Sequence, residues 1–129
     1  NRLNQKMVLD MQRSGVGLLA GSDCGETGMI HGFSLHEELE SLVKAGLSPL
    51  EALQTATINP AQFLEATDSL GSISKGKLAD LVILDDNPLS DITNTQKISG
   101  VISNGRYFNK VKLDSLLLSV ETNVKNNFK

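Results

Sequence analysis

The chain has 129 residues, with 12 basic and 15 acidic side chains and a formal net charge of −3. This length corresponds to about one domain, since domains cluster near 100–150 residues. The mild acidity argues against nucleic-acid binding, which needs a basic face, and no apolar stretch approaches the roughly 20 residues of a membrane span. A single cysteine excludes an intrachain disulfide and favours a reducing, cytoplasmic compartment. The chain begins at Asn1 without an initiator Met or a signal-peptide pattern, so we expect a piece of a longer protein.

The first part of the chain predicts a helix, a buried strand and a loop. Apolar residues spaced as on one helical face predict a helix over residues 1–13 that ends at Ser14-Gly15. The continuous apolar run over residues 16–20 predicts a strand buried on both faces, as in a parallel sheet, and glycine-rich residues 24–33 predict a loop. Because no other run offers this strand an evident parallel neighbour, the pattern again indicates missing sequence.

Three helix starts follow, each with a capping residue and an acidic or amide side chain three positions later. The pairs are Ser34 with Glu37, Ser48-Pro49 with Glu51, and Asn59-Pro60 with Gln62. In this arrangement the first side chain accepts a free backbone N–H of the first turn, and proline fits the first helical position. The sequence therefore predicts three helices in quick succession.

The second half of the chain predicts strands and a final helix. Residues 78–84 are typical of a buried strand, and residues 98–103 and 106–108 flank Asn104-Gly105. Asn-Gly is the strongest short hairpin signal, because both turn residues need positive φ. Apolar residues three or four apart predict an amphipathic helix over residues 111–124, whose stripe we interpret as a packing face.

Asp23 is the strongest candidate for chemistry that the residues themselves offer. It stands where the predicted strand opens into the glycine-rich loop, and active sites gather at the carboxyl ends of strands in barrels and open α/β sheets. A carboxylate there can bind a metal ion or act as a general base. The alternative is that Asp23 only bonds nearby backbone N–H groups in a turn.

His31 and His36 extend this candidate to the pattern D-x7-H-x4-H, and a catalytic zinc site does use about three protein ligands. The spacing matches no established metal motif, however, and His36 falls in the first turn of a predicted helix. We therefore interpret His36 as a helix-packing or surface residue and His31 as a loop residue that contacts substrate. A self-contained site formed by the two histidines and Asp23 is the alternative.

The remaining candidates have plainer interpretations. Cys24 could be a nucleophile, but the adjacent carboxylate disfavours its thiolate, so we interpret it as a small packing residue. Lys75 and Lys77 flank a glycine turn and are expected to be solvated, with a two-lysine phosphate site as the alternative. Asp80 begins the predicted strand and lies about 16 Å or more from the carboxylates at its end, which is too far for a carboxylate pair.

Several stretches taken together resemble the amidohydrolase superfamily. They are residues 19–23, 33–40, 45–53, 56–61, 70–85, 87–92 and 101–106. Gly21-Ser22-Asp23 is similar to the segment that closes the last barrel strand of that superfamily, and Ala79-Asp80 lies in a stretch similar to its C-terminal signature. The resemblance is nearest to the imidazolonepropionase-like and prolidase-like branch.

This resemblance implies an α/β fold in which the chain is the C-terminal segment of a (β/α)8 barrel plus part of a small β-sandwich and a terminal helix. Residues 16–23 would be the last barrel strand. On this basis residues 1–66 form the barrel segment, residues 67–110 the C-terminal part of the sandwich, and residues 111–129 the terminal helix.

The resemblance also implies one or two divalent metal ions, usually zinc, with Asp23 as both a metal ligand and a catalytic residue. The matching aspartate of the family contacts a metal and passes a proton from water to the leaving group, and a positioned carboxylate suits that task. The family's His-x-His pair, its bridging lysine or glutamate and two further histidines have no match here. The chain holds 2 histidines, His31 and His36, and both follow the aspartate.

We therefore predict a part of a metal-dependent amidohydrolase that hydrolyses a C–N bond in a small amide, cyclic amide or peptide-like substrate. The chain by itself would be inactive. Its partners would be the substrate and the rest of the barrel, with no nucleic acid and no membrane. Apolar surface that the barrel would cover should make the isolated chain self-associate. The alternative is a stand-alone, non-catalytic binding or scaffold module derived from such an enzyme.

Overall fold

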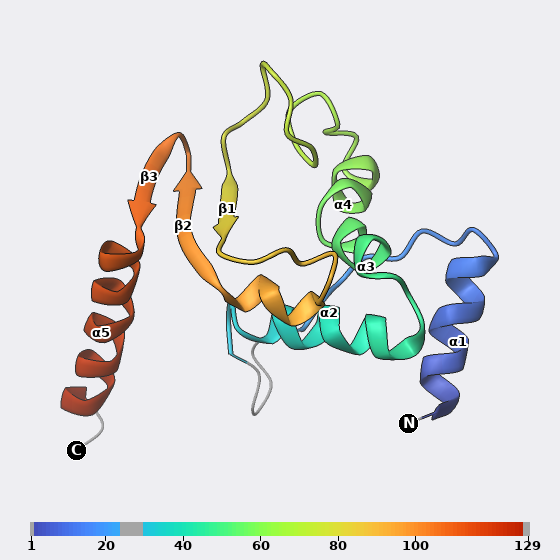
Figure 1. The fold of residues 1–129 in the computed structure, drawn as a ribbon, viewed down its shortest axis with the longest axis horizontal. Coiled ribbons are helices and arrows are strands. Elements are labelled where there is room, and N and C mark those ends of the chain that lie inside the picture. The colour runs from blue at the N-terminus through green and yellow to red at the C-terminus, as the bar shows by residue number, and fades with distance from the viewer. Residues whose placement is uncertain (1, 24–29, 128–129) are drawn as a thin grey trace.

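A computed structural model describes residues 2–23 and 30–127. The elements in chain order are α1 (Arg2–Arg13), α2 (Ser34–Ala45), α3 (Pro49–Thr55), α4 (Ile58–Phe63), β1 (Leu81–Leu84), the 3-10 helix η1 (Ile92–Gln96), β2 (Ile98–Ser103), β3 (Arg106–Asn109) and α5 (Lys110–Asn127). Helices α1 to α4 gather on one side of the molecule, and the sheet leads from them to α5 on the opposite side (Figure 1). Within the described ranges, no helix has the length and apolar character needed to cross a membrane.

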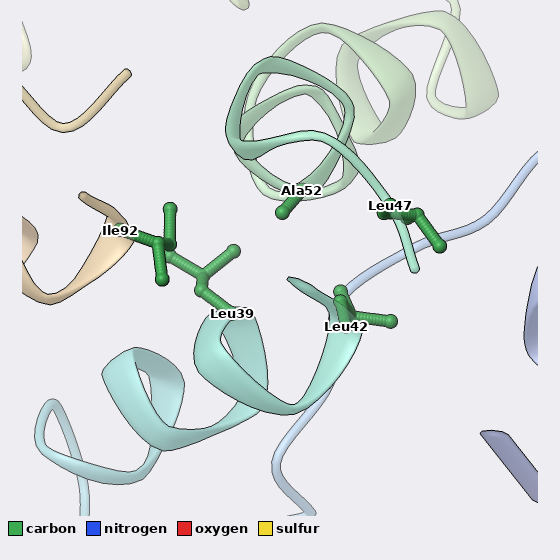
Figure 2. Close-up of a cluster of buried hydrophobic side chains, with 5 residues drawn as sticks. All are labelled: Leu39, Leu42, Leu47, Ala52 and Ile92. Atoms are coloured by element: carbon green, nitrogen blue, oxygen red, sulfur yellow. The ribbon is translucent and has the colours of Figure 1, made fainter. Parts of the chain in front are cut away.

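The hydrophobic core lies among α2, α3 and η1. Its five buried residues are Leu39, Leu42, Leu47, Ala52 and Ile92 (Figure 2). Leu39 faces Ile92, which η1 brings from far along the chain. The sequence did not predict η1, because its apolar content is a single isoleucine between polar residues. Ile92 therefore joins the helices to the region that precedes β2.

Residues 16–20 do not form the strand that we predicted. Leu18 and Ala20 pack against the core, whereas Val16 and Leu19 are exposed, and the segment belongs to no sheet among the described residues. The physical reason is that a strand is defined by its ladder of hydrogen bonds, and the described chain gives this segment no neighbouring strand. The expectation of a barrel strand is not met within this chain.

The second helix start is confirmed in detail. The Ser48 hydroxyl accepts the Glu51 N–H at 3.2 Å, and the Ser48 N–H donates to the Glu51 carboxylate at 2.7 Å. Pro49 occupies the first turn, where its missing N–H has no consequence. This reciprocal pair satisfies two backbone N–H groups of α3 that would otherwise be unpaired.

The other two predicted caps are wrong, although both helices exist. Helix α2 has Phe33 at its N-cap, and the buried Ser34 hydroxyl instead accepts the N–H of Ile30 at 2.8 Å. Helix α4 begins at Ile58, so Asn59 lies inside it, and its side chain donates to the carbonyl of Leu18. The Ser34 hydroxyl accepts from a residue outside its helix, and Asn59 lies too far inside α4 to cap it.

Strands β1, β2 and β3 form an antiparallel sheet in that order. The predicted hairpin is confirmed, with Asn104 at φ 49° and Gly105 at φ 73°. The predicted buried strand over 78–84 is shorter, because β1 begins at Leu81, and two of its four residues are exposed. The carboxylate of Asp80 accepts the N–H of Asn104 at 2.6 Å and ties the approach to β1 to the hairpin turn.

The terminal helix is confirmed as α5, but its predicted packing is not. Val111, Leu117, Leu118 and Val120 are each more than half exposed. One sheet of three strands is present in the described residues, so the second layer of the expected sandwich is not part of them. The stripe of α5 and both faces of β1 therefore lack a cover in the described chain.

The loop between α4 and β1 is fixed to α4. The Lys77 ammonium donates to the carbonyls of Thr67 and Leu70 and to the Ser72 hydroxyl, so Lys77 is not the solvated side chain that we expected. Gly71, at φ +81°, packs so closely that an added Cβ would lie 2.6 Å from the Cβ of Ala61. The two-lysine phosphate site has no support, because Lys77 is engaged in holding this loop.

Candidate active site around Asp23

Asp23 ends the segment that follows α1, and its backbone takes a left-handed conformation at φ 48°. Aspartate and asparagine are among the non-glycine residues that adopt this conformation most readily. Exposed and half-buried residues alternate from residue 17 to residue 23, as in an extended chain with one covered face. Asp23, like Leu19, is exposed.

Polar contacts from the helices hold this segment on its covered side. The N–H of Ala20 donates to the carbonyl of Thr55 at 3.0 Å, and the side-chain amide of Asn59 donates to the carbonyl of Leu18 at 2.9 Å. Thr55 lies at the end of α3 and is almost fully buried, and Asn59 is half-buried in α4. The sequence did not indicate either contact. Asn59-Pro60 has the local pattern of a helix cap, and the contact of Thr55 uses only its backbone carbonyl.

His36 joins α2 to η1, which agrees with its interpretation as a helix-packing residue. Its Nδ1 lies 3.0 Å from the Thr95 hydroxyl, which donates its own proton to the carbonyl of Ile92 at 2.9 Å. The hydroxyl therefore accepts, and His36 Nδ1–H donates. Burial lowers the pKa of His36, and the nearby Glu40 carboxylate opposes part of that shift.

The two histidines and Asp23 are not brought together as a metal site. His31 is exposed in the turn before α2, whereas His36 faces η1. In the part of the chain that the structure describes, no group of three or more His, Cys, Asp or Glu side chains could hold a metal ion. Cys24 lies outside the described residues.

The remaining acidic candidates have structural partners. Asp80 binds the hairpin turn, as described above, and Asp86 pairs with Lys97 at 2.7 Å. This ion pair raises the pKa of Lys97. Both partners are more than half exposed, so the pair contributes little to stability. Asp23 therefore stays a predicted site residue.

Comparison with known proteins places this arrangement in a family. A family model described as "Amidohydrolase family" matches residues 2–107. An adenine deaminase of Clostridium botulinum (strain Loch Maree / Type A3) is 39% identical over 79 residues, which are 61% of this chain and 12% of that protein.

Among solved structures, a Xaa-Pro dipeptidase with bound methionine is 32% identical, with a TM-score of 0.73 over 81% of this chain and 25% of that one. Molinate hydrolase is 34% identical, with a TM-score of 0.67 over 78% of this chain and 25% of that one. These matches define an α/β chain related to hydrolases. The chain belongs to the amidohydrolase family.

Each match covers most or much of this chain but only a small part of the relative. The chain spans 25% of the two solved structures named above and 12% of the curated deaminase. Most of each relative therefore has no counterpart in these 129 residues.

Proposed function

We propose that this chain serves in a longer amidohydrolase that hydrolyses a C–N bond of a small amide, cyclic amide or peptide-like molecule, with Asp23 as its proton-transfer residue. Family membership and the solved neighbours support this proposal. The names of two similar proteins, the adenine deaminase and the Xaa-Pro dipeptidase, describe deamination of adenine and cleavage of a dipeptide. Both reactions break a bond between carbon and nitrogen. The observation that carries it is the exposed Asp23 carboxylate at the end of a segment fixed by the helices.

Asp23 suits proton transfer by its placement. Its carboxylate can accept a proton from the attacking water and return it to the leaving nitrogen, which must be protonated to depart. The left-handed backbone at Asp23 sets where the carboxylate points, and the helices hold the preceding residues. A positioned acid-base group of this kind contributes about 10²- to 10⁴-fold to a rate.

A divalent metal ion, zinc in our proposal, would supply the polarisation of carbonyl and water that this reaction class uses. The described residues do not form a metal site by themselves, since Asp23 is a single carboxylate without two further ligands beside it. We propose that polypeptide outside this chain contributes the remaining ligands. His31, exposed just before α2, is proposed to contact the substrate.

Substitution of Asp23 in the longer enzyme tests the proposal. Asp23→Asn keeps the left-handed backbone and the shape of the side chain but removes the proton acceptor, so kcat should fall by about 10²- to 10⁴-fold. Asp68→Asn, at an exposed turn after α4, is the matched control and should leave kcat within about twofold. A near-normal kcat for Asp23→Asn would remove Asp23 from its role.

The 129-residue chain by itself should show no hydrolysis of C–N bonds and should self-associate through its uncovered apolar surface. Hydrolysis by the purified chain would contradict the first expectation, and a monomer by light scattering at high concentration would contradict the second.

If the longer protein also fails to hydrolyse any C–N bond, the chain acts as a binding or scaffold module. We also propose that the longer protein is cytoplasmic.

A further inference from the structure

One side chain of the helices contacts the backbone of the Asp23 segment. Of the two contacts described above, the one to Thr55 uses a backbone carbonyl that any residue would provide. The contact from Asn59 to the carbonyl of Leu18 depends on a particular side chain. It needs an uncharged donor of the length of asparagine, because an ionised carboxylate cannot donate and a glutamine is longer.

The two contacts lie two residues apart on the segment, at Leu18 and Ala20, and both residues also pack against the core. Together they define which residues face the helices. Since faces alternate with every residue, a slip by one position would exchange the covered and exposed sets and turn Asp23 toward the helices. No strand pairs with the segment in the described residues, so the helices set its register.

Asn59 lies in the first turn of α4 and donates its Nδ2–H to a group outside its own helix. It is half-buried beside an open hollow of about 470 Å³ that Leu19 and Phe63 also line. The contact joins residues 41 positions apart in the chain, so it ties the segment to a helix that is distant in sequence.

We propose that Asn59 is a positioning residue that fixes the register of residues 16–23 on α3 and α4 and thereby places the Asp23 carboxylate. The catalytic consequence rests on the proposed function, whereas the register itself does not. The two parts can therefore be tested separately.

Amide hydrogen exchange in the 129-residue chain tests the register. In Asn59→Asp the Ala20 amide should exchange about tenfold faster or more, because its bond to Thr55 is no longer supported. The amides of α2 should keep their rates, which shows that the helices stay folded. Gln62→Ala, which removes an exposed amide from the same helix, is the matched control and should leave the Ala20 rate unchanged.

The pH dependence separates a lost donor from a general loosening. After correction for intrinsic exchange, Asn59→Asp should regain protection at Ala20 below the usual carboxyl pKa of about 4, because the protonated acid can donate again. Asn59→Ala should show no such recovery. If the aspartate variant does not fold, the alanine variant gives the same comparison with Gln62→Ala without placing a charge near the Leu18 carbonyl.

In the longer enzyme, Asn59→Asp should lower kcat by about 10- to 100-fold with KM within about twofold, since a misplaced catalytic group slows chemistry more than binding. Equal Ala20 exchange in all three variants would overturn the proposal. Faster Ala20 exchange with an unchanged kcat would overturn the link to Asp23. If the wild-type enzyme hydrolyses no C–N bond, the proposed function fails, and the exchange data still decide the register.

Discussion

The core among α2, α3 and η1 and the sheet of this chain cover their side chains to very different degrees. In the core Leu39 is 4% exposed and Ala52 is 0% exposed, whereas in the sheet Val82 is 57% and Tyr107 61% exposed. Helix α5, which follows the sheet, resembles it, with Leu118 at 62%. The helices, η1 and the segment after α1 form layers that cover one another, and the sheet has no second layer among the described residues.

This difference shows that a complete hydrogen-bond ladder does not imply a complete core. Strands β2 and β3 meet because a two-residue turn brings them together, so their pairing is local. A sheet buries its apolar face only against another layer, and that layer comes from elsewhere in the chain or from outside it. The apolar side chains of β1 and α5 are therefore largely exposed in the described chain.

Truncating one side chain in the core and one in the sheet should give the largest difference in stability. Leu39→Ala removes buried atoms from the centre of the helical core and should lower the free energy of unfolding by about 2–5 kcal/mol. Val82→Ala in the sheet should change it by less than about 0.5 kcal/mol. Urea denaturation of both variants measures the difference. Equal losses would mean that the sheet is as well covered as the helices.

Substitution of two glycines should show how far the loop after α4 is fixed to that helix. Gly71 and Gly76 both have positive φ, so alanine at either should cost about 1 kcal/mol of backbone strain. At Gly71 the new Cβ would also meet Ala61 and the backbone of Ile58, whereas nothing lies within 4 Å at Gly76. Gly71→Ala should therefore cost about 1–3 kcal/mol more than Gly76→Ala in urea denaturation. Equal costs would show that this loop is not fixed to α4.

The smallest expected effect concerns the junction of α2 and η1. Because burial lowers the folded-state pKa of His36, the unfolded chain binds a proton first as the pH falls below the usual histidine pKa of about 6.5. The contribution of neutral His36 to stability is therefore present above that pH and is lost as the pH falls toward the folded pKa. The urea midpoint of the wild-type chain should decrease over this window.

His36→Gln should remove that part of the pH dependence while keeping a side chain that can donate to Thr95. His31→Gln is the matched control, because His31 is exposed in the preceding turn, and it should keep the wild-type slope. Urea midpoints at about pH 7 and about pH 5 are sufficient for the comparison. A His36→Gln slope that equals the wild-type slope would show that the junction does not depend on this histidine.

Local signals in the sequence predicted their elements well where the partners are also local. The Ser48 and Glu51 box formed as expected because both groups lie in one turn of chain, and Asn104-Gly105 formed its hairpin for the same reason. The predicted cap at Ser34 failed because its hydroxyl accepts the N–H of Ile30, and the predicted cap at Asn59 failed because α4 already begins at Ile58. The partner of Asn59, the Leu18 carbonyl, lies far away in sequence, and the residues around Asn59 do not indicate it.

The candidate site divides in the same way. Asp23 could be chosen from the sequence, because its position after an apolar run and before glycines resembles a known segment. Asn59 and Thr55, which hold that segment, could not be chosen, since their contacts join residues about forty positions apart. The predicted strand over 16–20 depended on neighbours that the described chain does not provide.

The sequence by itself determined the helices, the hairpin and the family, because these follow from spacing, turn chemistry and motif order along the chain. Only the tertiary structure decided that η1 completes the core, that Lys77 fastens a loop, and that Asn59 contacts the segment before Asp23. The physical reason is that a polar side chain makes the bond that its final surroundings allow. Those surroundings exist only after distant parts of the chain have packed together.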